Sequence, residues 1–467
     1  MFIKQFFVKG LSNMSYILGG RNSCAVIDPA RDVEIYIDEA EKMGYQITHI
    51  IETHLHADFI SGHMDLARLT GAKIVAPRSA GASFEHMAVG EGDRFEIDHL
   101  SIEVLETPGH TTEHVTYVVT DTSRGDEPVA AFTGDTLFVG DVGRPDLFPG
   151  RADELAEKLF ASIGKLMSLP DHVEVYPSHG AGSLCGKAMS AKRTSTIGYE
   201  RKYNPSIQPD TLEKFKTALL SDMPQAPDHF SRCSAVNGRG PTLLEDLPPI
   251  EAMEPTEFQN HIDAGALILD VRSPACFGGQ HIPGAINIDI TGNFATFAGW
   301  LLPPDRKILL VAHDVGDVEK AAGGLLSVGL DNIAGWLDGG LYRWVTSGRK
   351  FQSLPQLSVI ELESLMKNRE ITLLDVRSPG EFNKFHIDGA VNIPVPDTRT
   401  QFDRLKDKSV YVMCSSGHRS STASSILLQK GITGVTNIPG GITGWSGAGL
   451  SSGCPMCSHL HGPRVDE

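Results

Sequence analysis

Short apolar runs that end in polar turns recur through the N-terminal part of the chain. These runs are rich in Ile, Val, Leu and Ala, are short enough to be buried strands, and lie at 47–51, 102–105, 128–131 and 173–175. The turns that follow offer histidine or aspartate, namely His54, His56 and Asp58, then His110, Asp135 and His179. Strands of one sheet end at a common edge, so this repetition predicts that these side chains gather in one place.

The first turn, Glu52 to Phe59, carries the strongest chemical signal. Alternate side chains of an extended segment share a side, so His54, His56 and Asp58 are expected to point the same way. Imidazole and carboxylate together are ligands for a borderline or hard divalent metal. A metal-dependent enzyme is therefore the first hypothesis. The alternative, a polar loop without function, does not explain why three further strand ends offer the same residue types.

A second pattern begins after residue 247, where short sequence motifs recur. Leu-Asp-Val-Arg-Ser-Pro stands at 269–274 and again 105 residues later, and His-Ile-x-Gly-Ala at 281–285 recurs with the same offset. A period of this length indicates a duplicated domain and not a solenoid. Each copy alternates short β-rich runs with helical ones, which predicts two small parallel α/β domains, at 248–350 and 351–450.

Length and proline content complete the division of the chain. At about 150 residues per domain, 467 residues suggest three domains, of which the first covers 1–204. Residues 205–247 are rich in proline, and we interpret them as an extended linker with one helix over 210–221. Residues 451–467 are expected to form a flexible tail, which contains Cys454 and Cys457.

Cys414, in the second copy, is the candidate nucleophile. It follows a predicted strand at 409–413 and precedes a helix predicted over 420–429. The loop between them consists of Cys414, Ser415, Ser416, Gly417, His418 and Arg419. Backbone N–H groups and the positive end of the helix dipole favour thiolate over thiol at such a position. An inert buried cysteine is the alternative.

The length of this loop bears on its substrate. Cysteine-dependent phosphatases place five residues between cysteine and arginine, whereas four separate Cys414 from Arg419. The shorter loop suits a single sulfur on Cys414 with an anionic acceptor, such as sulfite, near Arg419. The corresponding loop of the first copy, 311–316, has no cysteine and carries Asp314. We therefore expect that copy to be catalytically inactive and to serve as a scaffold or an interface.

Composition narrows the class of function. The net charge of −17 argues against nucleic acid as the main partner, and 41% hydrophobic with 21% charged residues is typical of a folded globular protein. Neither a signal-type N-terminus nor an apolar run of about 18 residues is present, so we expect a cytoplasmic protein without a membrane partner. The seven cysteines form no secreted-type framework. We also predict a homo-oligomer.

The N-terminal motifs resemble those of the metallo-β-lactamase superfamily. His-x-His-x-Asp, Pro-Gly-His, Thr-Gly-Asp and a late His occur in that order within 1–204. The resemblance implies an αβ/βα sandwich with a metal at one edge of the sheets. Two-metal hydrolases of the superfamily carry, directly after the motif Asp, a His that binds the second ion. Phe59 occupies that position here, which counts against a paired-zinc hydrolase, including the hydroxyacylglutathione hydrolase type.

The sequence around the site is more similar to that of the persulfide dioxygenases of the superfamily, as in Thr107-Pro-Gly-His-Thr111 and Gly143-Arg-Pro-Asp146. This resemblance implies one Fe(II) per chain, and its implied ligands are His54, His110 and Asp135. Such a set of two histidines and one carboxylate leaves coordination positions open for substrate and O2. The resemblance further implies residues around the ligands that orient them or the bound persulfide, and these are His56, Asp58 and His179.

Two residues near this site are candidates for substrate contact. Arg144 would meet a substrate carboxylate or the growing sulfite charge, and a surface salt bridge is its alternative role. Cys185 lies in the glycine-rich stretch 180–186, where it would approach the persulfide or be a buried cysteine in a turn.

The two C-terminal copies resemble rhodanese (sulfurtransferase) domains, because Asp-Val-Arg, His-Ile-x-Gly-Ala and Gly-Gly-x-x-x-Trp occur in each. The expected fold class is thus an α/β multidomain chain, with a metallo-β-lactamase sandwich followed by two rhodanese-like domains. The whole chain resembles bacterial fusions of persulfide dioxygenase and rhodanese.

This resemblance implies a function in sulfide or persulfide detoxification. The persulfide of a small thiol, such as glutathione persulfide, would be oxidised with O2 to sulfite. Cys414 would pass sulfane sulfur to sulfite, giving thiosulfate, or run in reverse. Two alternatives remain: a zinc-dependent thioester hydrolase fused to a sulfurtransferase, and a carrier in which Cys414 stores sulfur for a partner protein.

Overall fold

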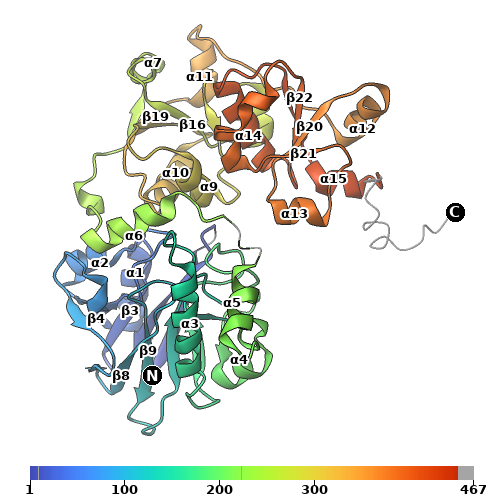
Figure 1. Cartoon of the computed structure of the whole chain (residues 1–467). Coiled ribbons are helices and arrows are strands. Elements are labelled where there is room, and N and C mark those ends of the chain that lie inside the picture. The colour runs from blue at the N-terminus through green and yellow to red at the C-terminus, as the bar shows by residue number, and fades with distance from the viewer. Residues whose placement is uncertain (9, 222, 224, 451–467) are drawn as a thin grey trace, which may run out of the picture. The chain divides into compact units, whose positions relative to one another are not determined.

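The apolar runs of the N-terminal part form two six-stranded sheets (Figure 1). The structure, a computed structural model, describes residues 1–8, 10–221, 223 and 225–450. Its backbone divides into two compact units. The first comprises Met1–Leu247 and the short segment Leu325–Leu330, and the second comprises Pro248–Gly324 and the chain from Asp331 onward.

The first sheet of the first unit has the order β1-β2-β3-β4-β5-β6. Its first three strands pair antiparallel and the others parallel. The strands are β1 Phe2–Val8, β2 Asn13–Gly19, β3 Ser23–Ile27, β4 Gln46–Ile51, β5 Lys73–Pro77 and β6 Met87–Val89. Helices α1 (Glu34–Met43) and α2 (His63–Thr70) connect the parallel strands. α1 ends at Gly44, whose φ of 72° permits the left-handed cap.

The second sheet has the order β14-β13-β10-β9-β8-β7. Its strands are β7 Arg94–Ile97, β8 Leu100–Glu106, β9 Val115–Asp121, β10 Ala130–Gly134, β13 Glu174–Pro177 and β14 Ser195–Thr196. A small hairpin of β11 (Leu137–Phe138) and β12 (Asp141–Val142) follows β10. Helix α3 (Ala152–Leu166) then leads to β13, and α4 (Ile197–Tyr203) follows β14.

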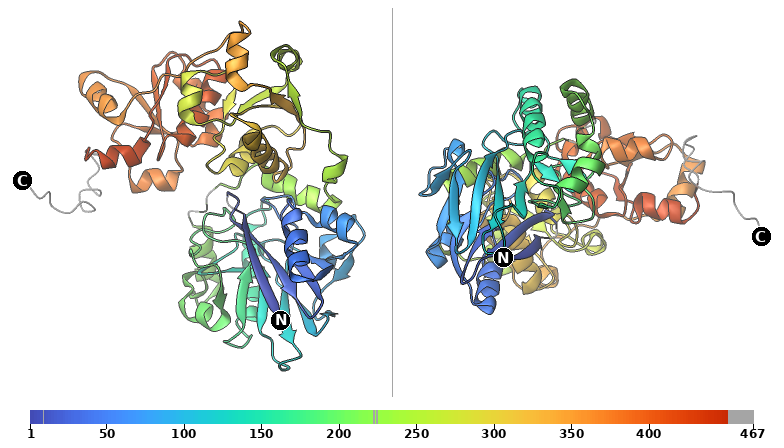
Figure 2. Two further views of the ribbon diagram at one scale, coloured as in Figure 1. Left: turned by 180° about the vertical axis from the view of Figure 1, so that it is seen from behind. Right: turned by 90° about the horizontal axis from the view of Figure 1, so that it is seen from below.

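Three apolar layers hold these elements together. The central layer lies between the two sheets and contains Leu18, Ile102 and Phe132. A second layer joins the first sheet to α1 and α2, and a third joins the other sheet to α3. Figure 2 shows the sheets and the helices of this unit from two further directions. The arrangement is an αβ/βα sandwich, and the predicted fold class of this part is confirmed.

Residues 205–247 differ from the extended linker with one helix that the sequence suggests. They contain two helices, α5 (Leu212–Leu220) and α6 (His229–Arg239), and belong to the first unit. Phe215 of α5 packs beneath α3, and Phe230 of α6 is also buried. The few apolar residues of α6 give a weak periodic signal, and its polar Asn237 makes its most specific contacts. Prolines therefore separate these helices without extending the chain.

The second unit contains two parallel sheets, one for each copy of the repeat. The first has the order β15-β19-β18-β16-β17, with bounds β15 Glu251–Met253, β16 Leu267–Asp270, β17 Ile286–Asn287, β18 Ile308–Val311 and β19 Ile333–Leu337. The other has the order β21-β20-β22-β23, with bounds β20 Thr372–Asp375, β21 Val391–Asn392, β22 Val410–Met413 and β23 Val435–Asn437.

Helices cover both of these sheets. Those of the first copy are α7 Pro255–Asp263, α8 Pro274–Gly279, α9 Phe294–Leu301, α10 Val315–Leu326 and α11 Gly340–Thr346. Those of the second are α12 Val359–Asn368, α13 Pro379–Lys384, α14 His418–Gln429 and α15 Gly441–Gly447. Helix α14 contacts β22 and β23 of its own copy and also β17 and α8 of the first copy. Eight consecutive residues of α14, from Ser420 to Leu427, are consequently buried.

The repeated sequence phrases have a structural role in both copies. In the second copy Arg377 binds the carboxylate of Asp375, and Asn392 donates to the backbone carbonyls of both residues. The ring of His386 stacks on Phe382, with 4.1 Å between centroids. The first copy repeats each of these contacts at the equivalent positions. The motifs thus stabilise the strand ends and do not by themselves indicate that a copy is catalytic.

Two further expectations concern the rest of the chain. Within the residues that the structure describes, no helix has both the length and the apolar character needed to span a bilayer. The predicted tail 451–467, with Cys454 and Cys457, lies outside the described residues.

We expect Leu18→Ala to destabilise the first unit by about 2–5 kcal/mol, because Leu18 is fully buried between the sheets and its truncation leaves a cavity. Hydrogen exchange of the β2 amides in increasing urea measures this change. Leu69→Ala is the matched control, since Leu69 is 55% exposed and its truncation should change stability by less than about 0.5 kcal/mol. Equal exchange in both variants would contradict the central layer.

Candidate metal centre and cysteine loop

The four polar turns that follow β4, β8, β10 and β13 meet at one edge of the sandwich. His54 comes after β4, His110 after β8 and Asp135 directly after β10, and all three side chains are fully buried. Their nearest ligand-type atoms lie within 4.8 Å of one another. The structure therefore brings the three predicted ligands together from distant parts of the chain.

The facing atoms of these residues have the arrangement that a cation requires. His110 Nε2 lies 3.2 Å and His54 Nε2 lies 3.9 Å from Oδ2 of Asp135. None of these three buried atoms has a hydrogen-bond partner among the described residues. Leaving buried polar atoms unsatisfied is unfavourable, so two imidazole nitrogens and a carboxylate oxygen that face one another fit a bound divalent metal.

The opposite side of each predicted ligand is held by a hydrogen bond. His110 Nδ1 donates to the backbone carbonyl of Arg144 at 2.9 Å. His54 Nδ1 lies 2.9 Å from Thr53 Oγ1, which in turn donates to Asp28. These partners place the proton on Nδ1 and leave the Nε2 lone pair directed at the centre. Asp135 Oδ1 accepts from His179 Nδ1 at 2.7 Å, which leaves Oδ2 free.

The charges of the site favour a bound cation. Burial lowers the pKa of both His54 and His110, so both rings are neutral and have lone pairs to donate. Burial alone would raise the pKa of Asp135, but the neighbouring His179 and His110 together outweigh it and bring the pKa well below its usual range. The three residues thus offer one negative charge and two neutral donors.

His56 does not join this group, although it belongs to the same motif. Its ring lies with Asp28 and Glu52 in a separate buried cluster, with 3.2 Å between Nε2 and Asp28 Oδ1. Burial would lower the pKa of His56, but Asp28 outweighs it and raises the pKa to about 9. Phe59 packs on this ring, with 4.3 Å between centroids. His56 and Phe59 therefore form one side of the site.

His179, Asp58 and Cys185 form a third buried group. His179 donates from Nδ1 to Asp135 and from Nε2 to Asp58 at 2.8 Å, so both of its nitrogens are occupied. Burial opposes a charged ring, but the two carboxylates raise the pKa of His179 well above its usual value. Burial raises the pKa of the Cys185 thiol well above its usual value, which keeps it protonated.

Arg144 lies inside the protein and not at its surface. Its guanidinium forms a bidentate pair with Asp146, at 2.6 and 2.8 Å, and also donates to the carbonyl of Leu184. Its side chain is fully buried. The structure thus connects Arg144 to the metal centre through its backbone carbonyl, which accepts from His110.

Two residues that sequence reasoning missed also shape this site. His114 Nε2 accepts a hydrogen bond from the backbone N–H of Asp135 at 2.9 Å. Asn237 of α6 donates to the carbonyls of His56 and Phe59 and accepts from the N–H of Ser61. His114 lies four residues after His110, so the sequence next to that motif could have indicated it. Asn237 is remote in sequence and gives no such signal.

The loop of Cys414 is shaped by the start of helix α15. The N–H groups of Ile442 and Thr443 bind the carbonyls of Cys414 and Ser415, at 2.8 and 2.9 Å. With its carbonyls held outward the loop turns N–H groups inward, and Gly417 N–H donates to Cys414 Sγ at 3.1 Å. A Cβ on Gly441 would lie 2.1 Å from the Cys414 carbonyl oxygen, so no side chain fits there. The sulfur thus accepts from one backbone N–H, and the hydroxyl oxygen of Ser420 lies 3.6 Å from it.

Arg419, expected near an anionic acceptor, is paired with a carboxylate. Its two terminal nitrogens each donate to one oxygen of Glu381 at 2.7 Å, and one also donates to Ser415 Oγ. Burial alone would raise the pKa of Glu381, but Arg419 outweighs it and lowers the pKa to about 2. Arg419 therefore holds the loop through its bond to Ser415, and the carboxylate of Glu381 balances its charge.

The equivalent loop of the first copy has a different local structure. Its strand β18 ends before Ala312, and Oδ1 of Asp314 accepts from the N–H of Asp317 at 2.9 Å at the start of α10. The carboxylate of Asp314 thus occupies the N–H of Asp317 at the start of this helix. This arrangement leaves no nucleophile among these residues.

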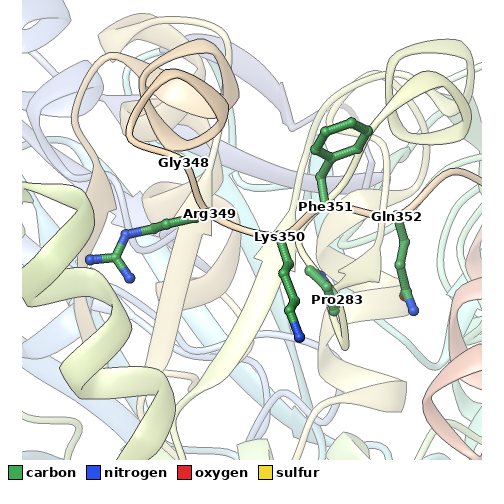
Figure 3. A pocket seen from close by; sticks show the side chains of 6 residues that line it. All are labelled: Pro283, Gly348, Arg349, Lys350, Phe351 and Gln352. Carbon is green, nitrogen blue, oxygen red and sulfur yellow. The ribbon is translucent and has the colours of Figure 1, made fainter.

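A surface pocket of the second unit does not contribute to either site. Pro283 and residues 348–352 line it (Figure 3). The Arg349 guanidinium beside it lies over the ring of Trp344 at 5.1 Å and donates to Thr256. That side chain therefore anchors α7 and α11, and none of the candidate site residues lines the pocket.

Known protein families match both parts of the chain. Residues 8–179 match the model of the metallo-beta-lactamase superfamily, and residues 254–347 and 358–448 each match the rhodanese-like domain. The chain belongs to the metallo-beta-lactamase superfamily and carries two rhodanese-like domains, so the predicted fusion architecture is confirmed. A solved metallo-beta-lactamase from Staphylococcus aureus is 35% identical, covers 72% of this chain and 98% of its own, and superposes with a TM-score of 0.65.

Individual relatives carry two different names. The mitochondrial persulfide dioxygenase ETHE1 of Mus musculus is 31% identical over 48% of this chain and 82% of its own length. A hydroxyacylglutathione hydrolase of Rhizobium meliloti is 36% identical over 31% of this chain, which spans 52% of that relative's length. The relatives thus support an enzyme of the metallo-hydrolase and ETHE1 group and do not choose between the two reactions.

We expect His110→Ala to lower the metal bound per chain at least about tenfold after anaerobic loading with Fe(II), because it removes one of three ligands. Elemental analysis of the desalted protein measures this. His172→Ala is the control, since His172 is exposed on a turn and should leave the metal content unchanged. Full metal content in the His110 variant would contradict this assignment of ligands.

The ion pair of Glu381 with Arg419 should make the stability of the second unit depend on pH in the acidic range. The folded-state pKa of Glu381, about 2, lies below the value of about 4.3 for an unfolded glutamate, so the pair stabilises the fold above about pH 4.3. This contribution disappears as the pH falls from there towards 2.

Glu381→Gln should accordingly lower the urea midpoint of the second unit most above about pH 5, with a difference that shrinks towards pH 3. Glu370→Gln, at an exposed carboxylate of the same domain, should show no such trend. A difference for Glu381 that does not vary with pH would refute the ion pair.

Proposed function

We propose that the first unit oxidises the terminal sulfur of a small-thiol persulfide with O2 to sulfite, at a single Fe(II) held by His54, His110 and Asp135. The observation that carries this proposal is the trio of buried, mutually facing and unpartnered ligand atoms. The reaction balances as RSSH + O2 + H2O giving RSH + SO3²⁻ + 2 H⁺. The sulfane sulfur loses four electrons, and O2 accepts them. Iron(II) in this site would supply the redox chemistry with O2.

A single metal is supported by what surrounds the trio. Phe59 has no donor atom and packs on His56, where a two-metal hydrolase has a metal-binding histidine. Both nitrogens of His179 bind carboxylates, so this ring serves better to hold Asp135 and Asp58 than to bind a second ion. Three protein ligands would leave further coordination positions of such a metal open to persulfide and O2.

The relative named persulfide dioxygenase supports the same substrate class. We propose glutathione persulfide or a similar small-thiol persulfide, one iron per chain, and an assembly of identical chains. The protonated Cys185 lies in the group beside Asp135 and contributes to the wall of this site. Arg144 contributes through its carbonyl by orienting His110.

Cys414 performs the second reaction that we propose. Its thiolate attacks the outer sulfur of a second persulfide, and the small thiolate leaves. The sulfur lone pair of sulfite then attacks the outer sulfur of the Cys414 persulfide. The S–S bond breaks, its electron pair stays on Cys414, and thiosulfate leaves. No external oxidant is needed, and the inward N–H of Gly417 stabilises the returning negative charge. The same steps run in reverse from thiosulfate.

Thioester hydrolysis is the second candidate for the first unit. It is favoured by the similar identity of the hydroxyacylglutathione hydrolase relative. It requires zinc and no O2, so the two candidates differ in a single measurable requirement.

We expect His110→Ala to reduce O2 consumption by a factor of about a hundred or more and to leave sulfur transfer from thiosulfate unchanged, because only the first reaction uses the metal. Cys414→Ser should have the opposite effect, since it removes the nucleophile. An oxygen electrode, with sulfite and thiosulfate quantified in the same sample, measures both reactions.

Cys276→Ser is the control, as Cys276 lies in the first copy and should leave both reactions unchanged. Joint loss of the two reactions in either site variant would contradict two separate sites. Thioester cleavage by zinc-loaded protein, with no O2 uptake after Fe(II) loading, would favour the hydrolase.

A further inference from the structure

The first, cysteine-free copy reaches the catalytic loop of the second copy through helix α14. Ser421 Oγ donates to Asn287 Oδ1 at 2.6 Å, and the backbone N–H of Asn287 donates to Ser425 Oγ at 3.0 Å. Gln429 at the end of the helix donates to the carbonyl of Gly284. The helix that follows the Cys414 loop is thus fixed to the first copy along its length.

The contact nearest the loop is an ion pair between Asp289 and His418. Oδ2 of Asp289 lies 3.0 Å from Nδ1 of His418, which is the fourth residue after Cys414. Oδ1 of Asp289 accepts from both the N–H and the hydroxyl of Thr291, each at 2.8 Å. The Asp289 side chain is only 4% exposed, whereas that of His418 is 45% exposed. The carboxylate is therefore the fixed member of the pair, and it determines how the ring is oriented.

This orientation gives His418 a donor at the loop. A carboxylate only accepts hydrogen bonds, so Nδ1 of the ring donates to Asp289. The bond to Asp289 uses Nδ1 only, and the side chain is 45% exposed, so Nε2 on the other side of the ring remains for a further partner. When Nε2 also donates, the ring binds an anion as imidazolium.

The other basic side chain of the loop is already engaged. Arg419 donates to both oxygens of Glu381 and to Ser415 Oγ, so an oxyanion would have to displace a bidentate carboxylate to bind it. His418 offers a donor without such competition. The acceptor of sulfur transfer should therefore be recognised by His418.

We propose that Asp289 of the cysteine-free copy is a positioning residue for sulfur transfer, and that it holds His418 so that Nε2 binds an oxygen of an oxyanion acceptor such as sulfite. This inference rests on the proposed sulfur transfer by Cys414. It gives the first copy a role in acceptor specificity, in addition to the interface that it provides. Asp289 itself does not contact the reacting sulfur.

The test compares two acceptors in the full chain. Glutathione persulfide is the donor, without O2 and at neutral pH, and the acceptor is either sulfite or cyanide. Cyanide is largely the neutral acid under these conditions and has no oxygen atom. Asp289→Asn and His418→Ala should each raise the KM for sulfite about tenfold, the size expected for one lost hydrogen bond to a charged group, with kcat changed less than about twofold. The constants for cyanide should not change.

Two controls separate positioning from folding. Asp305→Asn removes an exposed carboxylate of the same copy and should leave both acceptors unaffected. The double variant of Asp289→Asn with His418→Ala should have the same KM for sulfite as His418→Ala alone, because the carboxylate acts through the ring.

An unchanged KM for sulfite in His418→Ala would overturn the proposal. Because the His418 side chain is exposed, this variant gives a result even if Asp289→Asn does not fold. Equal losses with sulfite and cyanide would also overturn it, since they would indicate a structural effect. If the parent protein transferred sulfur to neither acceptor, the proposed function of Cys414 would fail, and that outcome is distinct from the other two.

Discussion

Three buried ligand atoms that face one another set the main constraint on the first unit. His54 Nε2, His110 Nε2 and Asp135 Oδ2 have no hydrogen-bond partners among the described residues. Each such atom costs about 1–3 kcal/mol unless something satisfies it. The surrounding hydrogen bonds do not relieve this cost, because they hold the opposite atom of each side chain. A divalent cation satisfies two lone pairs and a carboxylate at once, so the architecture of this edge of the sandwich is explained by a metal.

In the second unit, neighbouring elements likewise bind polar groups of the site, here the carbonyls and the arginine of the Cys414 loop. The start of α15 binds the loop carbonyls, and Glu381 binds Arg419. The groups in contact with the Cys414 sulfur are the backbone N–H of Gly417 and the hydroxyl of Ser420. The first copy lacks a nucleophile, yet its β17 and Asp289 bind the helix and the histidine that follow Cys414. The duplicated domain thus supports the one copy whose loop contains a cysteine.

Much of this organisation can be predicted from the sequence. Strand ends that offer His or Asp indicated the metal site, because a sheet brings its strand ends to a common edge. The repeated phrases indicated two domains, because their Asp–Arg and Asn contacts are formed within each copy.

The differences arise from contacts between residues that are distant in sequence. Asn237 binds the loop of His56 from α6, a helix whose apolar pattern is too sparse to predict, and so the expected linker is part of the first unit. The pairing of Arg419 with Glu381 is likewise invisible in a loop motif, since the partner lies 38 residues away. Periodicity reports which face of an element is buried and does not report which polar partner it meets.

Anomalous diffraction at the iron edge, from crystals of the anaerobically Fe(II)-loaded full chain, tests the central claim most directly. We predict one iron in the first unit, bound by Nε2 of His54, Nε2 of His110 and Oδ2 of Asp135, with His56 and His179 uncoordinated. Two metal peaks, or a metal bound by His56 or His179, would contradict it.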